Sequence, residues 1–121
     1  MSKSWQVVRS GEGEKTDFPW GRITWLANAT LGNSPDMTLA RVVIKRGEHN
    51  PAHRHRNCWE LLYLLSGRLR HYFSEESAEM EAGDLAVVAP GVAHWATTIS
   101  EDDAVMVVVY SVGDRQIEEV R

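Results

Sequence analysis

The residues with the clearest potential for chemistry lie between Gly47 and Gly67. His53 and His55 are separated by one residue, and Glu60 follows five residues after the second histidine. In a β-strand, alternate side chains point to the same face, so the two imidazoles, with Cα atoms about 7 Å apart, could both reach one ion. An unbroken strand would turn Glu60 to the opposite face. We therefore expect a bend at residues 56–57, because Asn57 tolerates turn conformations.

A fourth potential ligand follows a second glycine-containing stretch. Residues 83–94 read as a turn, a short apolar strand, a second turn and then His94. A single histidine of this kind is usually structural, but three imidazoles with one carboxylate suit a divalent first-row metal. The spacing predicts metal ligation by His53, His55, Glu60 and His94.

These two stretches resemble the two sequence motifs of the cupin superfamily. The first motif has the form Gly-x5-His-x-His-x4-Glu-x6-Gly, and it is matched at Gly47, His53, His55, Glu60 and Gly67. The second has the form Gly-x5-Pro-x-Gly-x2-His-x3-Asn, and it is matched at Gly83, Gly91 and His94. Ala89 and Thr98 replace its proline and asparagine, neither of which is a metal ligand in the family. The short segment between the motifs is typical of small single-domain cupins.

The resemblance implies a fold, a ligand set and partners. The fold would be an all-β, double-stranded β-helix of the jelly-roll type, which agrees with many short apolar segments separated by turns. The four residues would bind one divalent transition metal per chain, namely Fe, Mn, Ni, Zn or Co, and Glu60 could also transfer a proton. Sister chains commonly pair in this family, so we expect a homodimer.

Composition and charge narrow the class of protein. The chain has 121 residues, of which 43% are hydrophobic and 25% charged, as in ordinary globular domains. A net charge of −4 gives no basic surface for nucleic acid. No apolar run approaches a membrane span of about 20 residues, and the N-terminus shows no secretory signal. The single cysteine, Cys58, excludes an internal disulfide. We expect a cytoplasmic protein that binds neither membranes nor nucleic acid.

The pattern along the chain predicts a single cupin domain over residues 1–121. An N-terminal arm of about residues 1–20 would include a short strand at 5–8. The metal-binding barrel would span about residues 21–112, with a strand at 61–65 that is covered on both faces and a buried central strand at 104–110. The charged residues 114–121 would form a frayed tail.

The residues leave several functions open. We expect a metal-dependent enzyme that acts on a small polar metabolite, such as a sugar, keto acid or phenolic compound, as an isomerase or epimerase, a lyase or a dioxygenase. A non-catalytic module that binds or senses a small molecule is the alternative. His71 could line the barrel interior, Cys58 is expected to be a buried inert thiol, and His49 an exposed loop residue. Anion binding by Arg41, Arg68 or Arg70 is the weaker interpretation, because arginines on strands usually face solvent.

Overall fold

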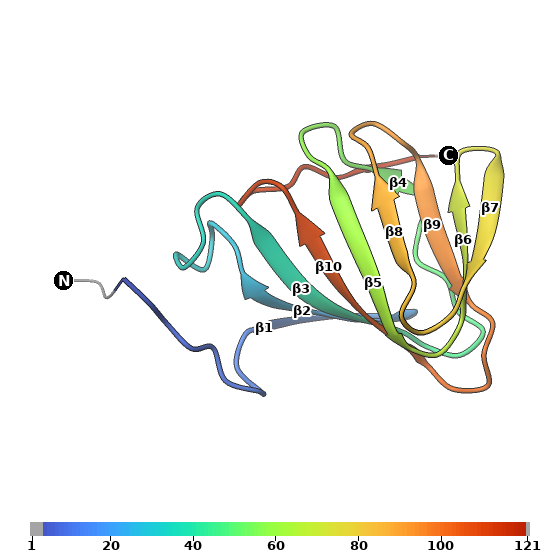
Figure 1. The fold of residues 1–121 in the computed structure, drawn as a ribbon, viewed down its shortest axis with the longest axis horizontal. Helices are drawn as coiled ribbons and strands as arrows, with labels where there is room; N and C mark the ends of the chain where they lie inside the picture. The colour runs from blue at the N-terminus through green and yellow to red at the C-terminus, as the bar shows by residue number, and fades with distance from the viewer. Residues whose placement is uncertain (1–3, 121) are drawn as a thin grey trace.

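The computed structural model describes residues 4–120 and shows two facing antiparallel β-sheets (Figure 1). No helix occurs in this range, so none of the described residues forms a helix that could span a membrane. The first sheet contains, in spatial order, β1 (Glu14–Phe18), β2 (Gly21–Ala27), β3 (Thr38–Ile44), β10 (Ala104–Tyr110), β5 (Glu60–Ser66) and β8 (Leu85–Val88). The second contains β11 (Glu118–Glu119), β4 (His53–Arg54), β9 (His94–Thr98), β6 (Leu69–Phe73) and β7 (Glu76–Met80). The predicted all-β, jelly-roll fold is confirmed.

Alternation of side chains along the central strands builds the interior. In β10, Ala104, Met106, Val108 and Tyr110 are buried, while the valines between them are only partly buried. Strands β3 and β5 flank β10 and repeat this alternation. One face of each strand therefore joins the core, as the period of two requires.

The turn after β5 depends on a glycine. Gly67 has a φ of 83°, and a Cβ atom there would lie 2.8 Å from the Cα of Ala104. Only glycine combines the left-handed backbone with so close an approach. This motif position therefore lets β5 turn back against the start of β10.

Three expectations from the sequence are wrong. Residues 5–8 form no strand; the first strand is β1, which forms a tight hairpin with β2. The segment 61–65 is covered on one face only, since Leu61, Tyr63 and Leu65 are 39–46% exposed. Residues 114–120 are not frayed, because β11 pairs with β4.

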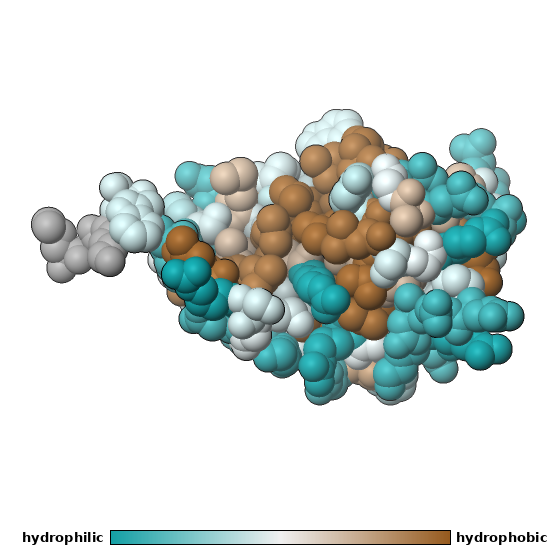
Figure 2. Space-filling model, turned by 60° about the horizontal axis from the view of Figure 1, so that its bottom comes forward, coloured by the Kyte–Doolittle hydropathy of each residue, from teal (hydrophilic) through white to brown (hydrophobic). Residues whose placement is uncertain are grey.

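The outer face of the six-stranded sheet is apolar over several neighbouring strands. Besides the three exposed side chains of β5, Leu85 and Val87 of β8 are 52% and 57% exposed. Figure 2 shows a broad apolar area over the middle of the molecule, where β10, β5 and β8 lie in Figure 1. Exposed apolar areas of this extent on soluble proteins often mark interfaces.

Candidate metal centre

Three strands bring the predicted ligands together. His53 opens β4 and is the register partner of His94, which opens β9 in the same sheet. After β4 the chain bends at residues 56–57, as the sequence predicted, and Glu60 opens β5 in the opposite sheet. The N–H of Gly91, whose φ is 85°, donates a hydrogen bond to the carbonyl of His55 at 2.8 Å. The turn of the second motif is thus tied directly to the first.

The four side chains form one compact, buried group. Each offers a ligand atom, and these atoms lie within 4.8 Å of one another. The Glu60 Oε1 atom is 3.1 Å from His55 Nε2 and 3.0 Å from His94 Nε2. All four residues are at least nine-tenths buried. Such a group is able to hold one divalent metal ion.

The far side of each imidazole ring is fixed by a backbone carbonyl. His53 Nδ1 lies 2.7 Å from the carbonyl oxygen of Pro51, and His94 Nδ1 lies 2.9 Å from that of Val92. His55 Nδ1 lies 2.8 Å from the carbonyl oxygen of Gln116. A carbonyl only accepts, so each Nδ1 carries the proton, and in the neutral ring Nε2 is left with a lone pair. Outer hydrogen bonds of this kind orient histidine ligands toward a metal.

This arrangement leaves an excess of lone pairs at the centre of the group. Burial favours the neutral acid form of Glu60, but His55 and His94 outweigh it and hold the pKa of that carboxyl below its usual range. Burial, together with the charge on His94, lowers the pKa of His53 to about 4. For His94, burial opposes the charged form, yet the contact with Glu60 raises the pKa. His55 Nε2 has no partner with hydrogen-bond geometry despite its 3.1 Å distance from Glu60.

A cation at the centre would resolve this excess. Without it, a carboxylate oxygen and imidazole lone pairs would face one another in a buried site, unless His94 Nε2 takes a second proton. The donor set, the fixed tautomers and the unpartnered Nε2 of His55 all fit a divalent ion. A proton and a metal ion therefore compete for the same group of side chains.

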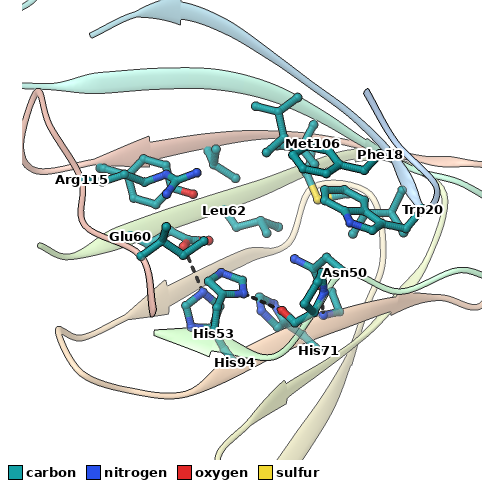
Figure 3. Close-up of a pocket in the computed structure, with 18 of the residues that line it drawn as sticks. Phe18, Trp20, Asn50, His53, Glu60, Leu62, His71, His94, Met106 and Arg115 are labelled. Carbon is teal, nitrogen blue, oxygen red and sulfur yellow. Dashed lines mark hydrogen bonds and ion pairs between the residues drawn. The ribbon is translucent and has the colours of Figure 1, made fainter. Parts of the chain in front are cut away.

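A cavity of about 190 Å³ adjoins the group (Figure 3). His53, Glu60 and His94 form part of its wall, so a small molecule in it would meet the ligand side chains directly. Most of the remaining wall is apolar, and it includes Phe18, Trp20, Ile23, Val42, Ile44, Leu62, Ala96, Met106 and Val108. Pockets that hold drug-sized ligands measure roughly 300–1,000 Å³, so this cavity suits a smaller molecule.

Five further polar side chains line this cavity: Asn50, His71, Tyr110, Arg115 and the exposed Glu119. His71 lines it, as one interpretation of the sequence suggested; burial lowers the pKa of His71 to about 4, and its buried Nδ1 has no hydrogen-bond partner in the described structure. Asn50, Tyr110 and Arg115 were not identified from the sequence. They carry no motif signal, and Arg115 reaches the cavity only because the C-terminal segment packs back on the barrel through β11.

The other residues considered from the sequence lie away from the cavity wall. His49 is exposed, and Cys58 is a buried thiol whose pKa is raised by burial, in keeping with an inert role. Arg41 is exposed on β3. Arg68 and Arg70 both lie within ion-pair distance of Glu79. None of these arginines is available to a ligand in the cavity.

Comparisons with known proteins agree with this architecture. The family model described as Cupin domain matches residues 40–110. A comparison with curated proteins gave no match. Among solved structures, an oxalate decarboxylase of Bacillus subtilis has a TM-score of 0.80 and 20% identity, and that of Lactobacillus farciminis has a TM-score of 0.80 and 17% identity. Another structure of the Bacillus subtilis enzyme, concerned with its Mn(II) centres, has a TM-score of 0.81 and 21% identity.

These solved structures are much longer than the present chain. Each alignment covers 88% of this chain but only 30–33% of the other. The chain thus spans about a third of the length of the decarboxylases it matches. At this level of identity, the likeness establishes a shared fold.

Proposed function

We propose that this chain, which belongs to the cupin family, is a metal-dependent enzyme that acts on a small polar metabolite. One observation carries the proposal: three imidazoles with carbonyl-fixed Nδ1 atoms and one carboxylate converge at the wall of a cavity. A site that served only to stabilise the fold would have no need of adjoining space. Here a substrate could lie directly against the ligand group.

In this proposal His53, His55, Glu60 and His94 hold one divalent transition metal. When bound, the ion would supply Lewis-acid polarisation of a carbonyl or hydroxyl oxygen. The hydrogen bonds from the Nδ1 atoms to backbone carbonyls hold the three histidine rings in the orientation that binds the ion. Glu60, which is held ionised, is the group we propose to accept and return a proton during the reaction. The apolar walls exclude water from this exchange.

Among the possible reaction types, the similarity to oxalate decarboxylases supports one as the first to test. Isomerisation or epimerisation, lyase chemistry and dioxygenation all fit the ligand set. The likeness to a decarboxylase structure concerned with Mn(II) centres supports lyase chemistry and makes manganese the first ion to test. Carbon–carbon bond cleavage in small keto and hydroxy acids is therefore the first assay.

Elemental analysis tests the metal part of this proposal. Untagged wild-type protein should contain about one equivalent of a divalent transition metal, and a His53→Ala/His55→Ala variant should contain little. A Glu60→Gln variant loaded at a metal concentration high enough to fill its weakened site should still lose turnover if Glu60 transfers the proton. Wild-type protein that takes up no divalent ion would refute the metal-dependent mechanism.

A second candidate is a non-catalytic module that binds or senses a small molecule. One observation favours it: beyond the ligand group, the cavity offers few groups for acid–base chemistry, since His71 has a low pKa and Glu119 is exposed. This function would be favoured if fully metal-loaded protein binds a keto acid, sugar or phenol saturably but converts none of the compounds tested.

We also propose that the chain forms a homodimer through the outer face of the six-stranded sheet. The exposed apolar side chains of β5 and β8 form a contiguous surface, and a two-fold interface can bury the same patch on both copies. Light scattering should report a dimer for wild type and for a Leu31→Lys control in a distant loop, but a monomer for Val87→Lys. A monomeric wild type would contradict this.

A further inference from the structure

Arg115 places a positive charge on the wall of the cavity. It precedes β11 and is partly buried, and its guanidinium carbon lies 4.8 Å from the centre of the Trp25 ring and 5.2 Å from that of Tyr110. Figure 3 shows Arg115 at the same end of the cavity as Glu60. Burial raises the pKa of the Tyr110 hydroxyl, and a side-chain hydrogen bond with Arg115 partly offsets that rise. The remaining N–H donors on the planar edge of the guanidinium are available to a ligand.

The charge of Arg115 has no acidic partner within residues 4–120. Other arginines do: Arg22 pairs with Asp17 and Arg56 with Glu118. In contrast, no carboxylate of the described chain lies within ion-pair distance of Arg115, and its buried Nε has no hydrogen-bond partner. A buried donor without an acceptor is costly, and a ligand anion would satisfy it with a charge-assisted hydrogen bond.

The opposite end of the cavity is apolar. Phe18 stacks on Trp20 with ring centres 4.7 Å apart, and Met106 lies beside them (Figure 3). A sugar placed there would leave hydroxyl groups without partners, which is unfavourable. A planar or branched hydrocarbon group would bury apolar surface instead.

The sum of charges also favours an anion. A divalent ion beside the ionised Glu60 leaves one net positive charge, to which Arg115 adds another. The exposed Glu119 at the rim offsets only one of them. In a cavity with low-dielectric walls, an uncompensated positive charge attracts an anionic ligand strongly.

We propose that Arg115 binds the carboxylate of a small substrate whose apolar body occupies the end of the cavity at Phe18, Trp20 and Met106. This rests on the proposed function for the presence of a substrate, and it narrows the class from small polar metabolites to small apolar carboxylic acids, such as aromatic or branched keto acids. Arg115 is a specificity-determining residue in this scheme, distinct from the metal ligands.

The test is calorimetric titration with benzoate and with benzamide, its neutral counterpart of nearly equal size. The proteins are wild type, Arg115→Gln, Arg115→Lys and the control Arg41→Gln, in which an exposed arginine outside the cavity is neutralised. Each is titrated as purified and after metal removal, with metal content and thermal midpoint measured alongside. We expect Arg115→Gln to weaken benzoate binding about tenfold or more, as for loss of a charged hydrogen bond, and to leave benzamide binding unchanged.

Partial recovery in Arg115→Lys and wild-type affinity in Arg41→Gln would complete the expected result. The proposal is overturned if wild type does not bind benzoate, if it binds benzamide as tightly, or if Arg115→Gln binds benzoate as tightly as wild type while keeping the wild-type thermal midpoint. If Arg115→Gln has a lowered thermal midpoint, Arg115→Lys decides the outcome: folded Arg115→Lys protein must still bind benzoate more tightly than benzamide. Protein that never contains metal but shows the Arg115-dependent preference would refute the proposed function alone.

Discussion

Replacing Glu60 by glutamine should remove most of the stability that the chain gains from a metal. The substitution keeps the size of the side chain but takes away the ionised oxygen that lies about 3 Å from two ligand nitrogens. Loss of groups that merely orient ligands lowers metal affinity 10–100-fold, so loss of the charged ligand itself should cost about 100-fold. Three neutral imidazoles would then hold the ion alone.

This loss translates into a measurable thermal shift. Free Mn(II) at 100 times the dissociation constant stabilises the folded state by about 2.7 kcal/mol. For a domain of this size, this corresponds to roughly 10 °C in Tm. For Glu60→Gln, the same metal concentration would be close to the weakened dissociation constant. The metal would then stabilise the variant by only about 0.4 kcal/mol, or roughly 1–2 °C in Tm.

Differential scanning calorimetry, with Mn(II) and with EDTA, measures both gains. Glu119→Gln is the matched control, because Glu119 also lines the cavity but is exposed and lies outside the ligand group. We expect its metal-dependent gain to equal that of wild type. Equal gains in wild type and Glu60→Gln would refute the assignment of Glu60 as a ligand, whatever the midpoint in EDTA.

Two further predictions concern pH and the backbone. Metal content after dialysis should fall as the pH drops through the raised pKa of His94, because a proton on its Nε2 displaces the ion. His53, with a pKa of about 4, stays neutral to lower pH. Metal content that is unchanged at pH 5 would contradict this order of protonation. Gly67→Ala should lower the free energy of unfolding by about 1–3 kcal/mol, because the new Cβ would meet Ala104 and the backbone is left-handed. Gly11→Ala, with a similar φ but open space around it, should cost less in the same urea titration, and equal losses would show that the close approach is unimportant.

The convergence of His53, His55 and Glu60 was predictable because the information for it is local. His53, His55 and Glu60 lie on one short segment, and the turn glycines of both motifs fix where the strands begin. A period of two and one bend were enough to bring these side chains together. The fold class followed similarly from the alternation of short strands and turns.

What the sequence did not reveal depends on contacts between distant segments. Residues 61–65 were predicted to be covered on both faces, but one face is exposed. An apolar run does not indicate whether its second face packs against another sheet or lies at the surface. The C-terminal segment is a second case. Its charged composition suggested fraying, yet it pairs with β4 more than 60 residues earlier. Charge alone gives no sign of such pairing, so Arg115 was missed.

That C-terminal segment links the two halves of the proposed site. Its Gln116 carbonyl accepts the Nδ1 hydrogen bond that orients His55, and the preceding residue is Arg115. The Asn57 side chain holds the same segment, accepting from the Gln116 N–H and donating to the Asp114 carbonyl. The bend that turns Glu60 toward the histidines therefore also anchors the arginine that we propose to bind substrate. A displacement of this segment would disturb a ligand and the anion-binding charge together, so metal affinity and carboxylate affinity should be coupled through it.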